Sequence, residues 1–422
     1  MPKKRMTGIN RRSVLKAGAG AAAAVALPQS RGMAEPVRGR PWDVAVVGAG
    51  VFGAWTAKKL QDAGKTVVLI DAWGPAHARA SSGGESRLTR GAYGPDEVYT
   101  RMAVESLADW RALSARAGLP IFHQTGVLFF FPQNDPFLDQ TMAVHRRLGL
   151  PTELLDAAAM RRRFPQMDFT GVAAGVFEPQ FGALMARRAV QTLVTEFVAA
   201  GGGYMQGMIP PVGPHDPLLS LTTTDGTLIP AARIVFACGP WLGKLFPDLL
   251  GRRIFPTRQE VFFFAPPPGD SSFDADRLPG WADFNGGDLY YGFPDLESRG
   301  FKIAHDAHGP PIDPDNGDRT PSPEALADVR AFMARRFPLM AGRPLSEARV
   351  CQYENSSNGD FLIDRHPEHE NVFLVGGGSG HGFKHGPAVG RYAAELVTGT
   401  LRAPEPRFSL ATKQEVQHRS VH

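Results

Sequence analysis

The residues with the clearest chemical potential lie near the N-terminus, in residues 43–71. Gly48, Gly50 and Gly53 form the spacing G-x-G-x-x-G between an apolar, β-branched run and a helical pattern. Such a turn lets a pyrophosphate approach the backbone at the N-terminus of the helix, where the N–H groups and the helix dipole favour negative charge. Asp71 ends the next apolar run and is placed to accept hydrogen bonds from an adenosine ribose. This arrangement predicts a dinucleotide site without distinguishing NAD from FAD.

Two later turns repeat the order of strand, glycine and helix. The first is the small-residue turn 237–241, Ala-Cys-Gly-Pro-Trp, at the end of a predicted strand. The second is the glycine-rich run 376–382, which follows the apolar stretch 372–375. It begins about 330 residues after Gly48, too far for one βαβ unit. We expect both ends of the chain to form one nucleotide site with the middle inserted, which is more typical of flavoproteins than of NAD dehydrogenases.

The elements that must position these residues follow from apolar periodicity. Predicted strands cover 44–47, 66–70, 125–131, 171–177, 259–265, 289–293, 300–304 and 372–375. Predicted helices cover 54–63, 98–117, 136–148, 154–164, 185–200, 325–337 and 388–398. Residues 219–224, 227–229 and 234–237 form a predicted β-meander, and residues 72–94 a predicted loop. If a helix begins near Arg87, that residue and Arg90 would share one face.

The first 34 residues resemble an export signal of the twin-arginine (Tat) type. Arg11 and Arg12 precede a weakly apolar run over 17–27 and small residues that end at Ala34. The run is too short to span a bilayer stably. We expect the Tat translocase to export the folded chain, with cleavage after Ala34 or nearby. A periplasmic or exported location is therefore predicted.

Composition and charge describe a globular protein with no nucleic-acid partner. The 422 residues, 43% hydrophobic and 21% charged, suggest about two domains. The formal net charge of +4 comes from the signal, because residues 1–34 hold seven Lys and Arg and no acid. The remaining chain has 39 basic and 42 acidic residues, so its charge does not favour nucleic acid.

The chain has two cysteines, Cys238 and Cys351. In an exported protein, one disulfide between them is a possible interpretation. Both also lie in cofactor-like segments, which favours separate roles, with Cys238 packed after its strand. No spacing of Cys or His resembles a metal site, so no metal is predicted.

Five motifs carry a resemblance to a known family. They are SSGGESRLTRGAYG at 81–94, YYGFP to GFK over 290–302, CQY at 351–353, DRHPEH at 364–369 and GSGHGFK at 378–384. With the opening βαβ pattern, they resemble the D-amino-acid-oxidase-like FAD superfamily, within it the monomeric sarcosine oxidase and N-methyltryptophan oxidase branch. The motifs extend over the whole chain that follows the signal, in order.

The resemblance implies an α/β fold with two domains. A Rossmann-like FAD domain of the glutathione-reductase type is expected from 41–120, 185–250 and 348–402. A substrate domain with a mixed β-sheet is expected from 121–184 and 251–347. The branch is largely monomeric, so a monomer is expected.

The resemblance also assigns the residues beside the flavin. Cys351 matches the position that attaches FAD covalently, through a thioether to the flavin 8-methyl carbon. Lys302 matches the lysine that activates O₂, where a fixed cation would stabilise superoxide-like charge. Arg87 matches the arginine close to the flavin ring. The turn with Gly380, Gly382, Phe383 and Lys384 is expected to bring backbone N–H groups near the flavin pyrimidine oxygen.

The substrate site is implied in the same way. Arg90 and Lys384 match the pair that holds the substrate carboxylate, for which a guanidinium and an ammonium are well suited. Tyr291 and Tyr353 match tyrosines that line the pocket. We group Lys302, Arg87 and Tyr353 as catalytic residues. His381 is expected to be structural.

The chain departs from the family pattern at two positions. Gly83 and Asp306 stand where we associate histidines with the flavin of sarcosine oxidases. His305 and His308 lie nearby in sequence and are alternatives, although packing or exposure is the simpler expectation for both. The departures leave the flavin chemistry intact and leave the substrate open.

The function implied is FAD-dependent oxidation of a secondary or N-methylated, sarcosine-like amino acid. Hydride transfer to the flavin would give an imine that hydrolyses, and O₂ would be reduced to H₂O₂. One alternative is an amine dehydrogenase that uses an acceptor other than O₂. The others are a non-catalytic flavin-binding protein and, least favoured, an NAD-dependent dehydrogenase.

Overall fold

A computed structural model describes residues 41–213, 218, 220–284, 289–307 and 309–418. The predicted signal, residues 1–34, lies outside these residues. Within the part described, no helix combines the length and the apolar composition needed to cross a membrane.

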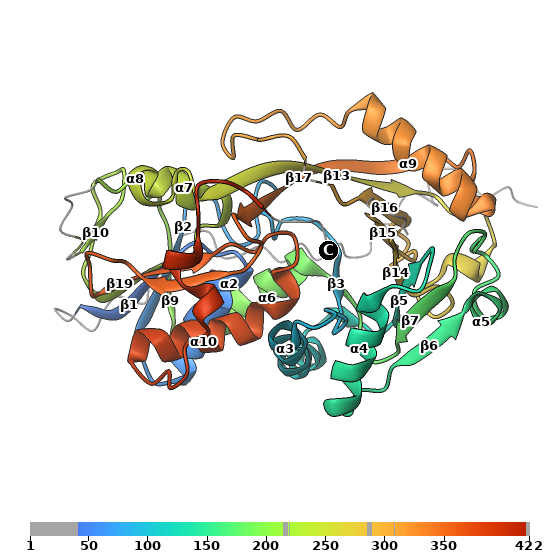
Figure 1. The fold of residues 1–422 in the computed structure, drawn as a ribbon. Coiled ribbons are helices and arrows are strands. Elements are labelled where there is room, and N and C mark those ends of the chain that lie inside the picture. Colours follow the sequence, from blue (N-terminus) through green and yellow to red (C-terminus); the bar gives the residue numbers. More distant parts are fainter. Residues whose placement is uncertain (1–40, 214–217, 219, 285–288, 308, 419–422) are drawn as a thin grey trace, which may run out of the picture. The chain divides into compact units, whose positions relative to one another are not determined.

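A six-stranded sheet carries the dinucleotide motif (Figure 1). Its order is β18 (Leu362–Arg365), β19 (Val372–Gly376), β12 (Ala231–Phe236), β1 (Trp42–Val47), β2 (Val67–Asp71) and β9 (Gly203–Gln206). All neighbours are parallel except the edge pair β18–β19. The strands are rich in Val, Ile and Phe because both faces are covered. The N-terminal and C-terminal parts of the chain therefore meet in one sheet, as predicted.

Two layers cover this sheet, and alternate strand residues face each of them. Val44 and Val46 pack with α2 (Val51–Asp62), α6 (Ala186–Ala199) and α10 (Gly386–Thr398). Ala45 and Val47 pack with α7 (Leu242–Leu245), α8 (Pro247–Leu250) and the hairpin of β10 (Leu221–Thr222) and β11 (Leu228–Ile229). The period of two in the strands thus divides the core into two layers.

An eight-stranded mixed sheet forms the second core (Figure 1). Its order is β17 (Leu345–Ser356), β13 (Ile254–Phe264), β16 (Phe301–His305), β15 (Leu289–Phe293), β14 (Gly280–Phe284), β5 (Val127–Phe131), β7 (Ala174–Glu178) and β6 (Glu153–Asp156). Only β5 and β14 pair in parallel. Its phenylalanine-rich face packs with α9 (Pro323–Arg336). The predicted class, a Rossmann-like α/β fold with a mixed-sheet part, is confirmed.

The remaining elements lie beside these sheets. They are α3 (Glu97–Arg116), α4 (Pro136–Arg147) and α5 (Ala157–Arg163), with a small sheet of β3 (Arg87–Thr89), β8 (Gly182–Leu184) and β4 (Phe122–His123). Strand β13 joins the two large cores, because Ile254 packs under the six-stranded sheet and Phe262 in the eight-stranded one. Strand β17 pairs with β13 from Leu345 to Ser356, so the predicted domain boundary at 348 falls within a strand. The two-domain division stays a prediction.

Three predicted elements are wrong. Residues 87–89 form a strand paired with β8, so Arg87 and Arg90 do not share a helix face. The predicted helix 154–164 is strand β6 followed by α5, because the Asp156 carboxylate accepts the Ala159 N–H at 2.6 Å and starts the helix there. Residues 231–236 belong to the six-stranded sheet rather than to a meander, because their buried valine and isoleucine pair with β1.

Candidate functional site

A cavity of about 300 Å³ lies at the carboxyl ends of the parallel strands. Gly48 lines it after β1, Asp71 at the end of β2, Cys238 after β12 and Gly378 after β19. In open α/β sheets this edge is where nucleotide ligands bind. The predicted dinucleotide segments therefore meet around one cavity.

The three glycines of the motif have different physical roles. A Cβ atom on Gly53 would lie 1.8 Å from the Gly48 carbonyl oxygen, so only glycine lets α2 pack on β1. Gly48 has φ +103°, and a Cβ there would lie 2.4 Å from the Ala237 carbonyl oxygen. Gly50 lines the cavity, and the nearest atom to its Cβ position is the Ser82 hydroxyl at 3.5 Å. That space suits the close approach of a phosphate.

Asp71 is held by backbone donors. Its Oδ2 accepts the Ala49 N–H at 2.7 Å, and its Oδ1 accepts those of Trp73 at 2.9 Å and Gly74 at 2.8 Å. These bonds fix the carboxylate at the cavity wall. Its predicted contact with a ribose stays a prediction.

Glu354 is a cavity residue that the sequence did not reveal. It follows Tyr353 on β17, is buried, and lines the cavity near Gly378. Its Oε1 has no hydrogen-bond partner among the described residues. Burial raises the pKa of this carboxyl to about 7, against the Gly377 and Gly378 N–H groups, which lower it. A buried carboxyl oxygen that forms no hydrogen bond costs free energy, so a ligand hydroxyl at Oε1 would be stabilising.

A second cavity, of about 110 Å³, adjoins the first. Both cavities are lined by Ala80, Arg87, Tyr353, Gly380 and Phe383. These shared residues mark the border at which a flavin ring would meet a substrate. The glycine at 380 is required there, because it has φ +78° and its Cβ would lie 2.8 Å from the Tyr353 ring.

The second cavity contains the predicted carboxylate-binding pair. Arg90 and Lys384 line it and are both buried. Arg90 Nη1 donates to the Ala92 carbonyl, and Lys384 Nζ donates to the His381 carbonyl at 2.7 Å. Tyr291 and Tyr353 line it too, and each affects the pKa of the other.

The structure brings Arg87 and Cys351 together. Arg87 Nη2 lies 3.8 Å from the Cys351 sulfur, and Arg87 Nη1 donates to the Ser86 carbonyl at 2.9 Å. Both side chains line the second cavity. Cys238 is separate: its thiol lies 3.3 Å from the Val47 carbonyl, and both cysteines are free rather than joined in a disulfide.

Lys302 lies in the wall of neither large cavity. Its ammonium donates to the carbonyls of Ser86 at 3.0 Å and Glu85 at 3.3 Å, two residues that line the second cavity. It therefore sits one peptide behind the wall. Burial, with a further contribution from Arg87, lowers the pKa of Lys302 well below 10.5.

One of the two departures from the family pattern, Gly83, has a local steric explanation. A Cβ atom on Gly83 would lie 2.0 Å from the His77 carbonyl oxygen, so no histidine fits there without a backbone shift. Asp306 lines the second cavity. His305 stacks on Tyr290 and pairs with Asp328 at 3.0 Å, which makes it a packing residue. His308 lies outside the described residues.

The residues around both cavities fit a dinucleotide such as FAD. The cavity has a glycine turn at a helix N-terminus, an acidic residue at the end of β2, and the buried Oε1 of Glu354, which none of the described residues hydrogen-bonds. A sulfur with a nearby arginine lies where the second cavity begins. The geometry thus combines a site for a cofactor with an adjoining cationic pocket.

Comparison with known proteins identifies the family. The family model described as FAD dependent oxidoreductase matches residues 43–396, and the model of the Tat signal sequence matches residues 8–28. The chain is 31% identical over 389 residues to monomeric sarcosine oxidase from Bacillus sp. (strain B-0618), which covers 90% of this chain and 99% of that protein. It is 32% identical over 356 residues to N-methyl-L-tryptophan oxidase from Yersinia pestis (strain Pestoides F), covering 84% and 94%.

Solved structures share the fold. L-Proline dehydrogenase from P. horikoshii superimposes with a TM-score of 0.76 at 21% identity, covering 88% of this chain and 97% of that one. Fructosamine oxidase from Aspergillus fumigatus gives 0.72 at 24% identity, covering 89% and 92%. The predicted family, the signal sequence and the choice of FAD over NAD are confirmed. The chain therefore belongs to the FAD-dependent oxidoreductase family as an enzyme close to monomeric sarcosine oxidase and N-methyl-L-tryptophan oxidase, and it carries a Tat signal sequence.

Proposed function

We propose that this enzyme oxidises a secondary or N-methylated amino acid at the C–H bond beside nitrogen and passes the electrons to O₂, which forms H₂O₂. The observation that carries this proposal is the buried pair Arg90 and Lys384 in a cavity that shares Tyr353 and Phe383 with the cofactor cavity. A carboxylate held by this pair lies beside the flavin site. The names of the relatives, which act on sarcosine and N-methyl-L-tryptophan, support the same substrate class.

Each wall of the second cavity has a distinct part in binding. Arg90 and Lys384 hold the carboxylate through charge-assisted hydrogen bonds. Phe129, Phe284 and Leu289 give an apolar wall that accommodates an N-alkyl group and excludes water. When bound, FAD supplies a two-electron acceptor for the hydride. The protein contributes the orientation of the reacting C–H bond.

Tyr291 and Tyr353 can hydrogen-bond the substrate but do not take up or release protons at neutral pH. Burial, together with the Asp306 carboxylate, raises the pKa of Tyr291 to about 12 and that of Tyr353 well above 10. Both phenols are therefore neutral hydrogen-bonding groups and not bases. The amine should consequently react in its neutral form, and the resulting imine hydrolyses in water.

A substrate panel tests the proposed function. Mixed without O₂, sarcosine, N-methyl-L-alanine and L-proline are expected to bleach the flavin absorbance at least about tenfold faster than glycine and L-alanine, because an N-alkyl group fills the apolar wall. Stopped-flow absorbance measures the rates. Sarcosine methyl ester is the control, since it keeps the amine and loses the carboxylate charge. Failure of every N-alkyl amino acid to bleach the flavin would contradict the proposal.

Covalent attachment of FAD through Cys351 belongs to this proposal. The yellow colour is expected to precipitate with the polypeptide in acid, and Cys351→Ser is expected to leave it in the supernatant. Cys238→Ser is the matched control, because Cys238 lines the cofactor cavity and contacts the Val47 carbonyl, whereas Cys351 lines the second cavity. Colour that stays soluble with the wild-type protein would show that the flavin is bound without the thioether.

The Tat signal indicates where the enzyme is located, and the two large sheets indicate how it is divided into domains. The Tat signal supports export of the folded enzyme with FAD already bound, to the periplasm or beyond. The six-stranded sheet with its cavity would be the FAD domain, and the eight-stranded sheet the substrate domain. A monomer follows from the branch that the chain resembles.

A further inference from the structure

One tyrosine, Tyr93, touches both members of the predicted carboxylate-binding pair, Arg90 and Lys384. The guanidinium carbon of Arg90 lies 3.8 Å from the centre of the Tyr93 ring, and the Lys384 ammonium donates to the Tyr93 hydroxyl at 3.1 Å. All three are buried, with exposed fractions of 7% for Arg90, 6% for Lys384 and 9% for Tyr93. The ring face thus holds one cation and the hydroxyl the other.

The direction of the Tyr93 hydroxyl bond follows from the chemistry of its neighbours. An ammonium only donates, so the Tyr93 oxygen accepts from Lys384 and its own proton goes elsewhere. His385 Nε2 lies 2.7 Å from that oxygen. His385 is fully buried, and burial with the nearby Lys384 charge lowers its pKa well below 6.5. His385 is therefore a neutral hydrogen-bond partner of the Tyr93 hydroxyl, whose single proton can go to only one acceptor.

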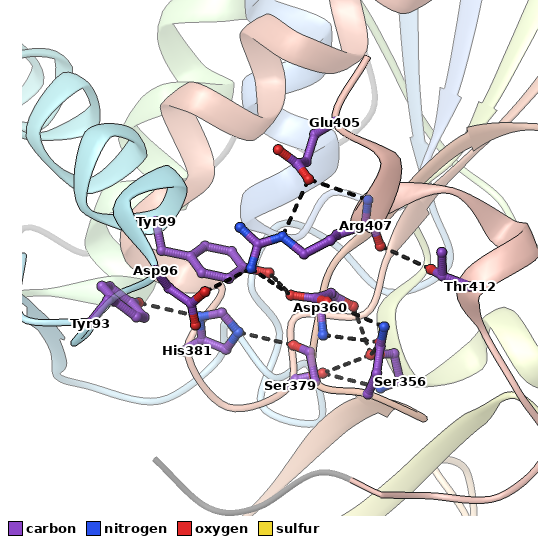
Figure 2. Close-up of polar contacts among 12 residues, drawn as sticks. Tyr93, Asp96, Tyr99, Ser356, Asp360, Ser379, His381, Glu405, Arg407 and Thr412 are labelled. Carbon is purple, nitrogen blue, oxygen red and sulfur yellow. Dashed lines mark hydrogen bonds and ion pairs between the residues drawn. The ribbon is translucent and has the colours of Figure 1, made fainter. Parts of the chain in front are cut away.

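A second imidazole, His381, accepts that proton, so His385 Nε2–H donates to the Tyr93 oxygen. His381 Nδ1 lies 3.2 Å from the Tyr93 hydroxyl, and its Nε2 lies 3.1 Å from the Gly359 carbonyl, to which it donates. Nδ1 of a neutral ring in that state accepts. Figure 2 shows Tyr93 directed at His381 and the neighbouring Tyr99 directed at Asp360. The two tyrosine hydroxyls therefore form hydrogen bonds with different residues, although the ring centres lie only 5.3 Å apart.

We propose that Tyr93, backed by His385, is a positioning residue that sets the separation of Arg90 and Lys384 and makes the cavity selective for a carboxylate. Lys384 donates to Tyr93 and to the His381 carbonyl, at 3.1 and 2.7 Å, so two of its three N–H directions are fixed and the third follows from the tetrahedral nitrogen. Fixing a flexible ammonium before binding removes an entropic cost of association. The inference rests on the proposed function only in that the cavity binds an amino-acid carboxylate.

The test compares Tyr93→Phe with Tyr99→Phe in the flavin-containing protein. Methoxyacetate, an ether analogue of sarcosine, and its neutral amide are titrated, and the perturbation of the flavin spectrum gives the dissociation constants. Tyr93→Phe keeps the ring against Arg90 and loses the hydrogen bond to Lys384. It is expected to raise the dissociation constant of methoxyacetate about tenfold. The amide should bind unchanged. Tyr99→Phe loses its buried bond to Asp360, at 2.6 Å, and should leave both constants unchanged.

A second variant and a kinetic measurement guard against a general loss of structure. His385→Leu removes one hydrogen-bond partner of the Tyr93 hydroxyl and keeps the bond between Tyr93 and Lys384, so the dissociation constant of methoxyacetate is expected to rise about threefold. With a reactive amino acid and no O₂, Tyr93→Phe should raise the half-saturating substrate concentration and leave the limiting bleaching rate within about twofold.

Three results would overturn the inference. The first is that Tyr93→Phe and Tyr99→Phe change the dissociation constant of methoxyacetate equally. The second is that Tyr93→Phe weakens the binding of methoxyacetate and of its amide equally. The third is that the wild-type protein does not bind methoxyacetate. If the wild type binds methoxyacetate and no amino acid bleaches its flavin, the proposed function fails while the positioning role of Tyr93 stands.

Discussion

Lys302→Met is expected to slow O₂ consumption by about 10²- to 10³-fold, while substrate still bleaches the flavin absorbance when O₂ is absent. Electron transfer to O₂ creates negative charge, and a buried cation stabilises that charge more strongly than one in water. The two backbone carbonyls of Glu85 and Ser86 hold the Lys302 ammonium directly behind the second cavity. The measurement combines an oxygen electrode with anaerobic stopped-flow absorbance.

The pH dependence of this reaction has a definite sign. Burial lowers the pKa of Lys302 well below 10.5, and only the protonated form supplies positive charge. O₂ consumption should therefore fall as pH rises through that lowered pKa, at a lower pH than for an exposed lysine. Lys302→Met should remove this inflection.

The control for Lys302 is another buried lysine. Lys413 has the same exposed fraction, 2%, and burial lowers its pKa to about 8, but it lines neither cavity. Lys413→Met should reduce stability and leave O₂ consumption within about twofold of wild type. An unchanged rate in Lys302→Met, or loss of anaerobic bleaching as well, would contradict the assignment. A wild-type enzyme that is bleached by substrate but consumes no O₂ would favour the dehydrogenase alternative.

Arg90→Leu and Lys384→Met are each expected to lower the apparent second-order rate constant for an N-methyl amino acid by about 10²- to 10³-fold. The reason is that removing one partner of a desolvated charge pair leaves the substrate carboxylate buried without compensation. The rate constant for sarcosine methyl ester should change much less, because the ester has no charge to lose. Anaerobic bleaching rates over a substrate concentration series give both values.

Arg336→Leu provides the matched control for these two variants. Arg336 is as buried as Arg90, pairs with Asp283 at 2.9 Å, and lines neither cavity. Arg336→Leu should lower the melting temperature without changing the ratio of the rate constant for the N-methyl amino acid to that for sarcosine methyl ester. The carboxylate assignment is wrong if Arg90→Leu lowers the rate constants for the amino acid and for the ester by the same factor. A non-catalytic flavin-binding protein would show no bleaching with either substrate.

The sequence by itself determined the features that depend on neighbouring residues. The strand, glycine turn and helix around Gly48 and Gly53 are local, and Gly53 permits a close approach to the Gly48 carbonyl within one βαβ unit, whereas Gly48 is required by the distant Ala237 carbonyl. The long apolar patterns predicted β1, β2, α6 and α10 within a few residues. The motifs predicted the family. The pattern at 154–164 gave a wrong prediction, because one apolar run includes both strand β6, which pairs with β7, and the capped helix α5.

Tertiary structure alone decided what lies beside each reactive group. Tyr93 meets His385 across 292 positions of the chain, and Glu354 meets the glycine turn through the register of β17 on β13. No periodicity records such contacts, because they depend on how α3, β17 and the turn before α10 pack. Lys302 likewise became a residue behind the cavity wall rather than in it, because β16 directs its ammonium to the Glu85 and Ser86 carbonyls. Sequence patterns specify elements and motifs, whereas the distances on which chemistry depends arise from the packing of distant elements.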